Sequence, residues 1–145
     1  MINHMNKAIE MAKKAYSMDE TPVGCVIVKD GVIIAAEHNT TIKDANATHH
    51  AEINAINCAS TYVGCSNLSD CELYVTLEPC PMCAGAIINS KIKRVYIGAP
   101  EPKSGCFGSV SNFNTLNFNH KPEVYIGICE DECKNLLQDF FKKLR

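Results

Sequence analysis

Two thiols three residues apart, Cys80 and Cys83, mark the point at which a strand-like run of the sequence gives way to a helix-like one. If Cys80 opens the helix, both sulfurs lie about one turn apart on the same face and can reach one metal ion. The amino end of a helix also favours the thiolate, the form of cysteine that binds metals. Two sulfurs fill only half of a tetrahedral zinc site, so the spacing predicts a further ligand elsewhere in the chain.

The third ligand is predicted upstream, at His50, beside a second helical run over residues 51–59. Glu52 follows two residues later, close to the ion but badly placed to bind it alongside the imidazole. A carboxylate in that position suits a group that handles protons for a metal-bound water. With His50, Cys80 and Cys83 as ligands and water at the fourth corner, the site is of the open, catalytic kind.

The other periodicities place this site in an α/β fold. Residues 72–76 are typical of a strand, residues 80–90 of a helix and residues 94–97 of another strand, which together predict a βαβ unit with parallel strands. The site then lies beyond the carboxyl ends of strands, where ligands of such sheets usually bind. The remaining predicted elements are a surface helix over residues 4–17, a hairpin of strands 23–28 and 32–36, a strand over residues 123–128 and a helix from residue 129.

The H-x-E step at His50 and the P-C-x-x-C step at Pro79 together form the signature of zinc-dependent nucleobase deaminases. On these motifs the chain resembles the cytidine deaminase-like superfamily. Similarities along nearly the whole chain make it resemble, within that superfamily, the bacterial tRNA-specific adenosine deaminases. The supporting positions are residues 22–26, Asn39, and residues 50–52, 76–86, 90–92, 94–95, 98–99, 108–109, 131–133, 136–137 and 139–141.

The resemblance implies a cytidine deaminase-like three-layer α/β/α fold with a central five-stranded mixed sheet, in a single zinc-dependent deaminase domain over residues 1–145. It implies one Zn²⁺ per chain, Glu52 as the catalytic acid and base, and deamination of adenosine to inosine at position 34 of a tRNA anticodon loop. It also implies a homodimer. Glu101 is a departure, because the resembled family commonly has Asp there. The implied nucleoside contacts are Asn39, Ala51 and Pro79, and the implied RNA contacts are Lys103, Phe141, Lys142 and Lys143.

Charge alone does not suggest a nucleic-acid partner. A net charge of −2 and an isoelectric point near 6.2 argue against a protein that coats nucleic acid by bulk electrostatics. A local basic patch and an ordinary solvated face are both compatible with the lysine and arginine positions. The candidate patch residues are Lys91, Lys93, Arg94, Lys103, Lys142, Lys143 and Arg145.

The chain has nine cysteines, an odd number. Charged residues interrupt the apolar positions of the first 16 residues, which argues against a signal peptide or a membrane span. Reduced thiols and a cytoplasmic location are therefore expected. Cys129 and Cys133 have one-turn spacing but lack the His or Cys partners of a second metal site. The cysteines expected to pack as small apolar side chains are Cys25, Cys58, Cys71, Cys106, Cys129 and Cys133.

Several alternatives stay open at this level. Deaminases of free guanine, cytosine or cytidine use the same zinc chemistry, and the pocket walls decide between substrates. A structural zinc clip, or a thioredoxin-like use of Cys80 and Cys83, would leave Glu52 without a role. A non-catalytic partner subunit would be expected to lack Glu52. His49 is a second imidazole beside the predicted ligand, although the H-x-E spacing favours His50.

Overall fold

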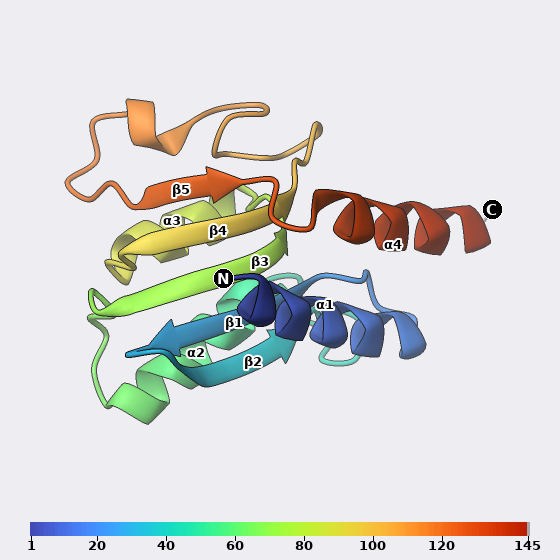
Figure 1. Cartoon of the computed structure of the whole chain (residues 1–145), viewed down its shortest axis with the longest axis horizontal. Helices are drawn as coiled ribbons and strands as arrows, with labels where there is room; N and C mark the ends of the chain where they lie inside the picture. Colours follow the sequence, from blue (N-terminus) through green and yellow to red (C-terminus); the bar gives the residue numbers. More distant parts are fainter. Residues whose placement is uncertain (145) are drawn as a thin grey trace.

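A five-stranded mixed sheet forms the centre of the computed structural model, which describes residues 1–144 (Figure 1). The strands are β1 (Gly24–Lys29), β2 (Val32–His38), β3 (Cys71–Leu77), β4 (Arg94–Ala99) and β5 (Glu123–Ile126). Their order across the sheet is β2-β1-β3-β4-β5. β1 is antiparallel to both of its neighbours, whereas β3, β4 and β5 are parallel to one another. The predicted mixed sheet is confirmed.

Helices cover both faces of this sheet. α1 (Ile2–Ser17) and α4 (Glu130–Lys143) lie on one face, and α2 (Ala51–Val63) and α3 (Pro81–Asn89) lie on the other (Figure 1). A short 3-10 helix, η1 (Phe113–Thr115), lies in the long segment between β4 and β5. The three-layer α/β/α arrangement that the resemblance implies is confirmed.

β1 divides the buried side chains between the two helical layers, because successive side chains of a strand point to opposite faces. Cys25 and Ile27 belong to the cluster that packs with α2 and α3, while Val26 and Val28 pack beneath α1. α2 reaches the sheet through a row of small buried side chains, so its first turn is anchored in the core. These are Ala51, Ala55 and Ala59.

The predicted βαβ unit is formed by β3, α3 and β4, with the two strands parallel. Cys80 is the N-cap of α3, with an extended backbone (φ −73°, ψ 174°), and Pro81 is the first helical residue. Proline suits that position, since its missing N–H would have no partner there. The helix therefore begins at the residue on which the metal-binding prediction depends.

Turn residues set the ends of several elements. Asp30 and Gly31 both have left-handed φ angles, 51° and 77°, as a two-residue hairpin turn requires, and the predicted hairpin is confirmed. α2 continues past residue 59 and ends at Val63, followed by Gly64 as its C-cap with a φ of 76°. β5 ends at Ile126 rather than at residue 128, because Gly127 turns the chain with a φ of 100°.

None of the helices in residues 1–144 has the length and apolar composition that a bilayer crossing requires. All nine cysteines are free thiols. Four of the six that were predicted to pack as small apolar side chains are buried, and two are half-buried. The buried ones are Cys25, Cys71, Cys106 and Cys133, and the half-buried ones are Cys58 and Cys129.

Candidate metal and catalytic site

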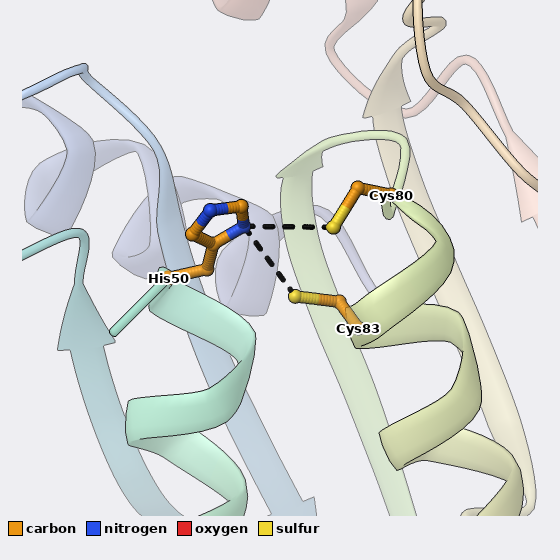
Figure 2. Close-up of side chains that lie close together, drawn as sticks. All are labelled: His50, Cys80 and Cys83. Carbon is orange, nitrogen blue, oxygen red and sulfur yellow. Dashed lines mark hydrogen bonds between the residues drawn. The ribbon is translucent and has the colours of Figure 1, made fainter. Parts of the chain in front are cut away.

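Two helix N-termini meet at the edge of the sheet where β2 and β3 end, and they bring the predicted ligands together. His50 is the N-cap of α2, and Cys80 is the N-cap of α3, with Cys83 in its first turn (Figure 2). Both caps have extended backbones, so their side chains project from the helix ends toward each other. The partial positive charge of each helix end favours anionic sulfur at this point.

The distances between the donor atoms fit a tetrahedral metal site. His50 Nδ1 lies 3.6 Å from Cys80 Sγ and 3.7 Å from Cys83 Sγ, and all three atoms lie within 4.8 Å of one another (Figure 2). With Zn–N and Zn–S bonds of usual length at tetrahedral angles, the nitrogen and sulfur ligands stand about 3.6 Å apart. The arrangement therefore fits zinc with three protein ligands. Within residues 1–144 this is the one cluster of His, Cys, Asp and Glu with such a geometry.

Contacts within the cluster shift the pKa values of the two thiols and of the imidazole. The hydrogen bond from Cys83 and the interaction with His50 lower the pKa of Cys80 to about 4, although partial burial opposes this. The same hydrogen bond, together with burial, raises the pKa of Cys83. The contact with Cys80 raises the pKa of His50. The cluster thus carries a thiolate at neutral pH, which attracts a cation.

Glu52 is a buried carboxyl group, 4% exposed, in the first turn of α2. Burial raises its pKa to about 7. A carboxyl group with that pKa both accepts and releases a proton near neutrality, as a general acid and base must. It lines the same pocket as His50 and Cys80.

A pocket of about 240 Å³ opens above the ligands. Of the three residues that were predicted to contact a nucleoside, Asn39 and Ala51 line it. Pro79 is buried and does not line it, and the Pro79 carbonyl accepts a hydrogen bond from the backbone N–H of Cys106. The lining residues are Thr21, Val23, Asn39, Thr41, His50, Ala51, Glu52, Leu77, Glu78, Cys80, Glu101 and Ser104.

His49 points away from the two sulfurs. Its Nδ1 pairs with Asp44 Oδ2 at 2.7 Å, and its Nε2 lies 3.1 Å from the side-chain amide of Asn46. Both partners belong to the loop between β2 and α2, so this imidazole fastens the loop. The neighbouring His50 is the imidazole that faces the thiols (Figure 2).

A larger groove of about 690 Å³ adjoins the pocket and shares Thr21, Leu77 and Glu101 with it. Three of the four predicted RNA contacts line this groove, and α4 adds Lys134, which sequence reasoning missed. Those three are Lys103, Phe141 and Lys142.

The fourth predicted RNA contact, Lys143, is directed elsewhere. It pairs with Asp19 at 3.6 Å and lies 5.0 Å from the centre of the Tyr16 ring. Arg94, a candidate for the basic patch, forms ion pairs with Glu72 and Glu123 at 2.9 Å each. These pairs lie at the opposite end of the sheet from the pocket. The prediction for Arg145 falls outside the described residues.

Glu78 is the main residue of the site that sequence reasoning missed. Its buried carboxylate accepts hydrogen bonds from the backbone N–H groups of Glu101, Phe107 and Ser109 at 3.0 to 3.1 Å, and another from the Ser109 hydroxyl. Burial opposes ionisation, but these hydrogen bonds lower its pKa. Glu78 thus holds the loop that forms one wall of the pocket. Its place directly before the P-C-x-x-C step was the available signal.

Comparison with known proteins finds similarity along nearly the full chain. A family profile described as "MafB19-like deaminase" matches residues 2–145. A tRNA-specific adenosine deaminase of Bacillus subtilis is 44% identical over 143 residues, covering 98% of this chain and 89% of the relative. A solved structure from a study of A-to-I editing by tRNA:A34 deaminases superposes with a TM-score of 0.92 at 40% identity. It covers 94% of this chain and 100% of its own.

A guanine deaminase from Nitrosomonas europaea shares the same fold at lower identity. Its TM-score is 0.85 and its sequence identity is 23%, with 96% of this chain and 83% of that chain covered. At this identity the likeness extends to the architecture only. This chain therefore shares more of its sequence with the two adenosine deaminases, at 40% identity or more, than with the guanine deaminase.

Proposed function

Because this chain belongs to the MafB19-like deaminase family and, within it, to the tRNA-specific adenosine deaminases, we propose that its pocket deaminates adenosine 34 of tRNA to inosine. One observation carries the proposal. In a chain that aligns with these relatives from end to end, the His50, Cys80 and Cys83 cluster stands beside a buried carboxyl group in one pocket. The reaction consumes one water and releases one ammonia.

We infer that the metal is zinc, one ion per chain, held by His50, Cys80 and Cys83. One imidazole and two sulfurs are ligands that zinc prefers, and their separations fit its tetrahedral geometry. When bound, zinc supplies Lewis acidity that lowers the pKa of water to about 7, so that hydroxide is available at neutral pH.

Glu52 handles the protons of the reaction in this proposal. It accepts one proton from the attacking water and delivers it to the ring nitrogen next to the amino-bearing carbon. It then transfers the remaining proton of the added hydroxyl group to the amino group, so that the carbon–nitrogen bond breaks, ammonia leaves and the oxo group forms. Its raised pKa, about 7, matches a group that must both accept and donate near neutral pH. The carboxyl group is buried, so bulk water does not compete with the substrate for its proton.

Asn39, Ala51 and Pro79 are proposed to position the nucleoside. The first turn of α2 has backbone N–H groups without partners inside the helix, and Ala51 lies there against the pocket. Asn39 presents a side-chain amide to the same space. Pro79 supports the pocket floor, because it joins Glu78 to Cys80 and its carbonyl holds the Cys106 backbone.

The groove beside the pocket is proposed to hold the rest of the anticodon loop. Lys103 and Lys142 provide positive charge for phosphates, and Phe141 is a ring on which a base can stack. Lys134 adds a further positive charge. Lys143 is proposed as an RNA contact from the edge of α4, where its pairing with exposed Asp19 is exchangeable with a phosphate.

The test is deamination of a defined tRNA. We expect the zinc-loaded protein to convert adenosine 34 of a tRNA with an ACG anticodon to inosine, read by sequencing of the product. The same tRNA with guanosine at position 34 is the matched control and should stay unchanged. Ammonia release from free guanine or cytosine, with no inosine in the tRNA, would show that the protein is a free-base deaminase instead.

We propose that the chain forms a homodimer. Large apolar side chains are exposed on α2 and on the segment between β4 and β5, which is typical of interaction surfaces. They are Tyr62, Val110, Leu116 and Phe118. Light scattering after gel filtration is expected to give about twice the chain mass of 15.9 kDa. A mass equal to one chain, in a preparation that is fully active on tRNA, would contradict this.

We further propose that residues 1–145 act as one zinc-dependent deaminase domain and that the protein works in the cytoplasm. One sheet runs through the described residues. α1, α2 and α4 pack directly on its strands, and α3 contributes Ala84 and Ile87 to the same hydrophobic core. The nine free thiols suit a reducing compartment.

A further inference from the structure

Glu20 is a buried carboxylate that the proposed reaction does not use. It is 1% exposed and lies in the connection between α1 and β1. Within residues 1–144 it forms no salt bridge, so hydrogen bonds must compensate for its burial. Burying a carboxylate costs free energy, so the partners of its hydrogen bonds indicate what it holds in place.

The end of α1 fixes the backbone of Glu20. Asp19 has a left-handed φ of 57°, and its N–H donates to the carbonyl of Tyr16 at 3.1 Å. The N–H of Glu20 donates to the carbonyl of Ala15 at 3.0 Å. This pair of bonds is the Schellman motif, which closes a helix with a defined turn. The Glu20 side chain therefore leaves the helix end in a set direction, toward the loop that follows β2.

The carboxylate grips that loop with both oxygens. Oε2 accepts the backbone N–H of Lys43 at 2.7 Å, and Oε1 accepts that of Ile42 at 3.1 Å. Oε1 also accepts the side-chain N–H of Asn39 at 3.4 Å. Hydrogen bonds to a charged acceptor are stronger than neutral ones. One side chain thus ties the α1–β1 connection to three points of the loop that forms a wall of the pocket.

The contact with Asn39 also selects the orientation of its amide. An ionised carboxylate only accepts hydrogen bonds, so the NH₂ group of Asn39 must face Glu20. The second contact of that NH₂ group is with the Thr41 hydroxyl at 3.5 Å. The Oδ1 atom of Asn39 makes no hydrogen bond within residues 1–144 and is left as an acceptor for a ligand in the pocket.

We propose that Glu20 is a positioning residue that fixes the amide orientation of Asn39 and the wall formed by residues 39–43. The expected effect of Glu20 on substrate binding rests on the proposed function. Its expected effect on the loop rests on the hydrogen bonds alone. It assigns to Asn39 a single role toward the nucleoside, that of a hydrogen-bond acceptor for an N–H or O–H group.

Glu20→Gln is the sharpest variant, because it keeps the shape of the side chain and replaces one oxygen with NH₂. In either orientation that NH₂ group faces an N–H donor, of Lys43 on one side or of Ile42 and Asn39 on the other. We expect KM for the tRNA to rise about 10-fold with a small change in kcat, since a binding contact is lost. Metal content should stay at the wild-type level. Glu10→Gln, the same change at an exposed carboxyl group on α1, is the matched control and should leave KM unchanged.

A double variant separates positioning from general destabilisation. If Glu20 acts on substrate through Asn39, adding Glu20→Gln to Asn39→Ala should raise KM by much less than 10-fold. A full additional 10-fold rise in that background would overturn the proposed route. Glu20→Asp, which keeps two accepting oxygens, is expected to recover part of the wild-type KM and also guards against misfolding of the Gln variant.

Hydrogen exchange reads the same contacts without any substrate. The backbone N–H groups of residues 42 and 43 are expected to exchange about 10-fold faster in Glu20→Gln than in the wild type. Unchanged exchange there, or an unchanged KM in a variant with normal metal content, would overturn the proposal. Should the wild type fail to deaminate tRNA, the proposed function fails while the exchange rates still decide whether Glu20 holds the loop.

Discussion

Replacing Glu52 by alanine is expected to lower the rate of tRNA deamination by about 10²- to 10⁴-fold, the range typical for loss of a general acid and base. The physical reason is the position of this carboxyl group. It is 4% exposed, its pKa is raised to about 7 by burial, and it lines the pocket beside His50 and Cys80. The measurement is single-turnover inosine formation with enzyme in excess, which reports the chemical step apart from product release.

The Glu52 variant should keep its metal, because the three proposed ligands, His50, Cys80 and Cys83, are unchanged in it. Metal analysis of the purified variant provides the control, and the expected zinc content equals that of the wild type. Tight binding of tRNA should also persist, since the groove residues are unchanged. An Ala variant with empty metal sites would contradict the role in proton transfer and indicate that Glu52 is a ligand instead.

Cys83→Ala is expected to remove the metal and, with it, all measurable deamination. Cys83 is fully buried in the first turn of α3, and its sulfur stands 3.7 Å from His50 Nδ1. With alanine, two protein ligands remain, which is too few for tight zinc binding. The readout is the zinc content per chain after dialysis, measured together with activity. Thermal unfolding should also shift to lower temperature, because bound metal stabilises the folded state that holds it.

Cys71→Ala provides the matched control for that loss. Cys71 is also a buried free thiol, but it packs in the core at the start of β3, far along the strand from the metal cluster. The same substitution there should cost about 1 kcal/mol of stability and leave both zinc content and kcat unchanged. Equal metal loss in both variants would show that the effect of Cys83→Ala arises from damage to the core.

Much of the fold could be predicted from local patterns in the sequence. The parallel unit around Cys80 was predicted from a strand, a helix and a strand in sequence, and the hairpin from the Asp30-Gly31 step, whose two left-handed residues the structure contains. The helix that begins after Cys80 was predicted from the residue types alone. These features depend on interactions between residues close in sequence, so the sequence carries a direct signal for them.

The walls of the pocket were predicted less well. Glu78 and Thr21 line it, and neither was identified as part of the site from the sequence. Lys142 and Lys143 were both predicted to contact RNA, and the two neighbours face different surfaces: Lys142 lines the groove, whereas Lys143 lies over the Tyr16 ring. Adjacent residues of a helix point about 100° apart, so a run of lysines does not define one surface.

The amino-acid sequence by itself determined the types of the proposed ligands, their spacing and the carboxyl group beside them, because each stands at the N-cap or in the first turn of a helix that its own neighbours specify. Only the tertiary structure decided which side chains hold the surrounding loops. Glu20 reaches Asn39 across 19 residues, and Glu78 reaches Ser109 across 31. Hydrogen bonds between segments so far apart leave no periodic trace in the sequence, and they form only when packing of the sheet and helices has brought the segments together.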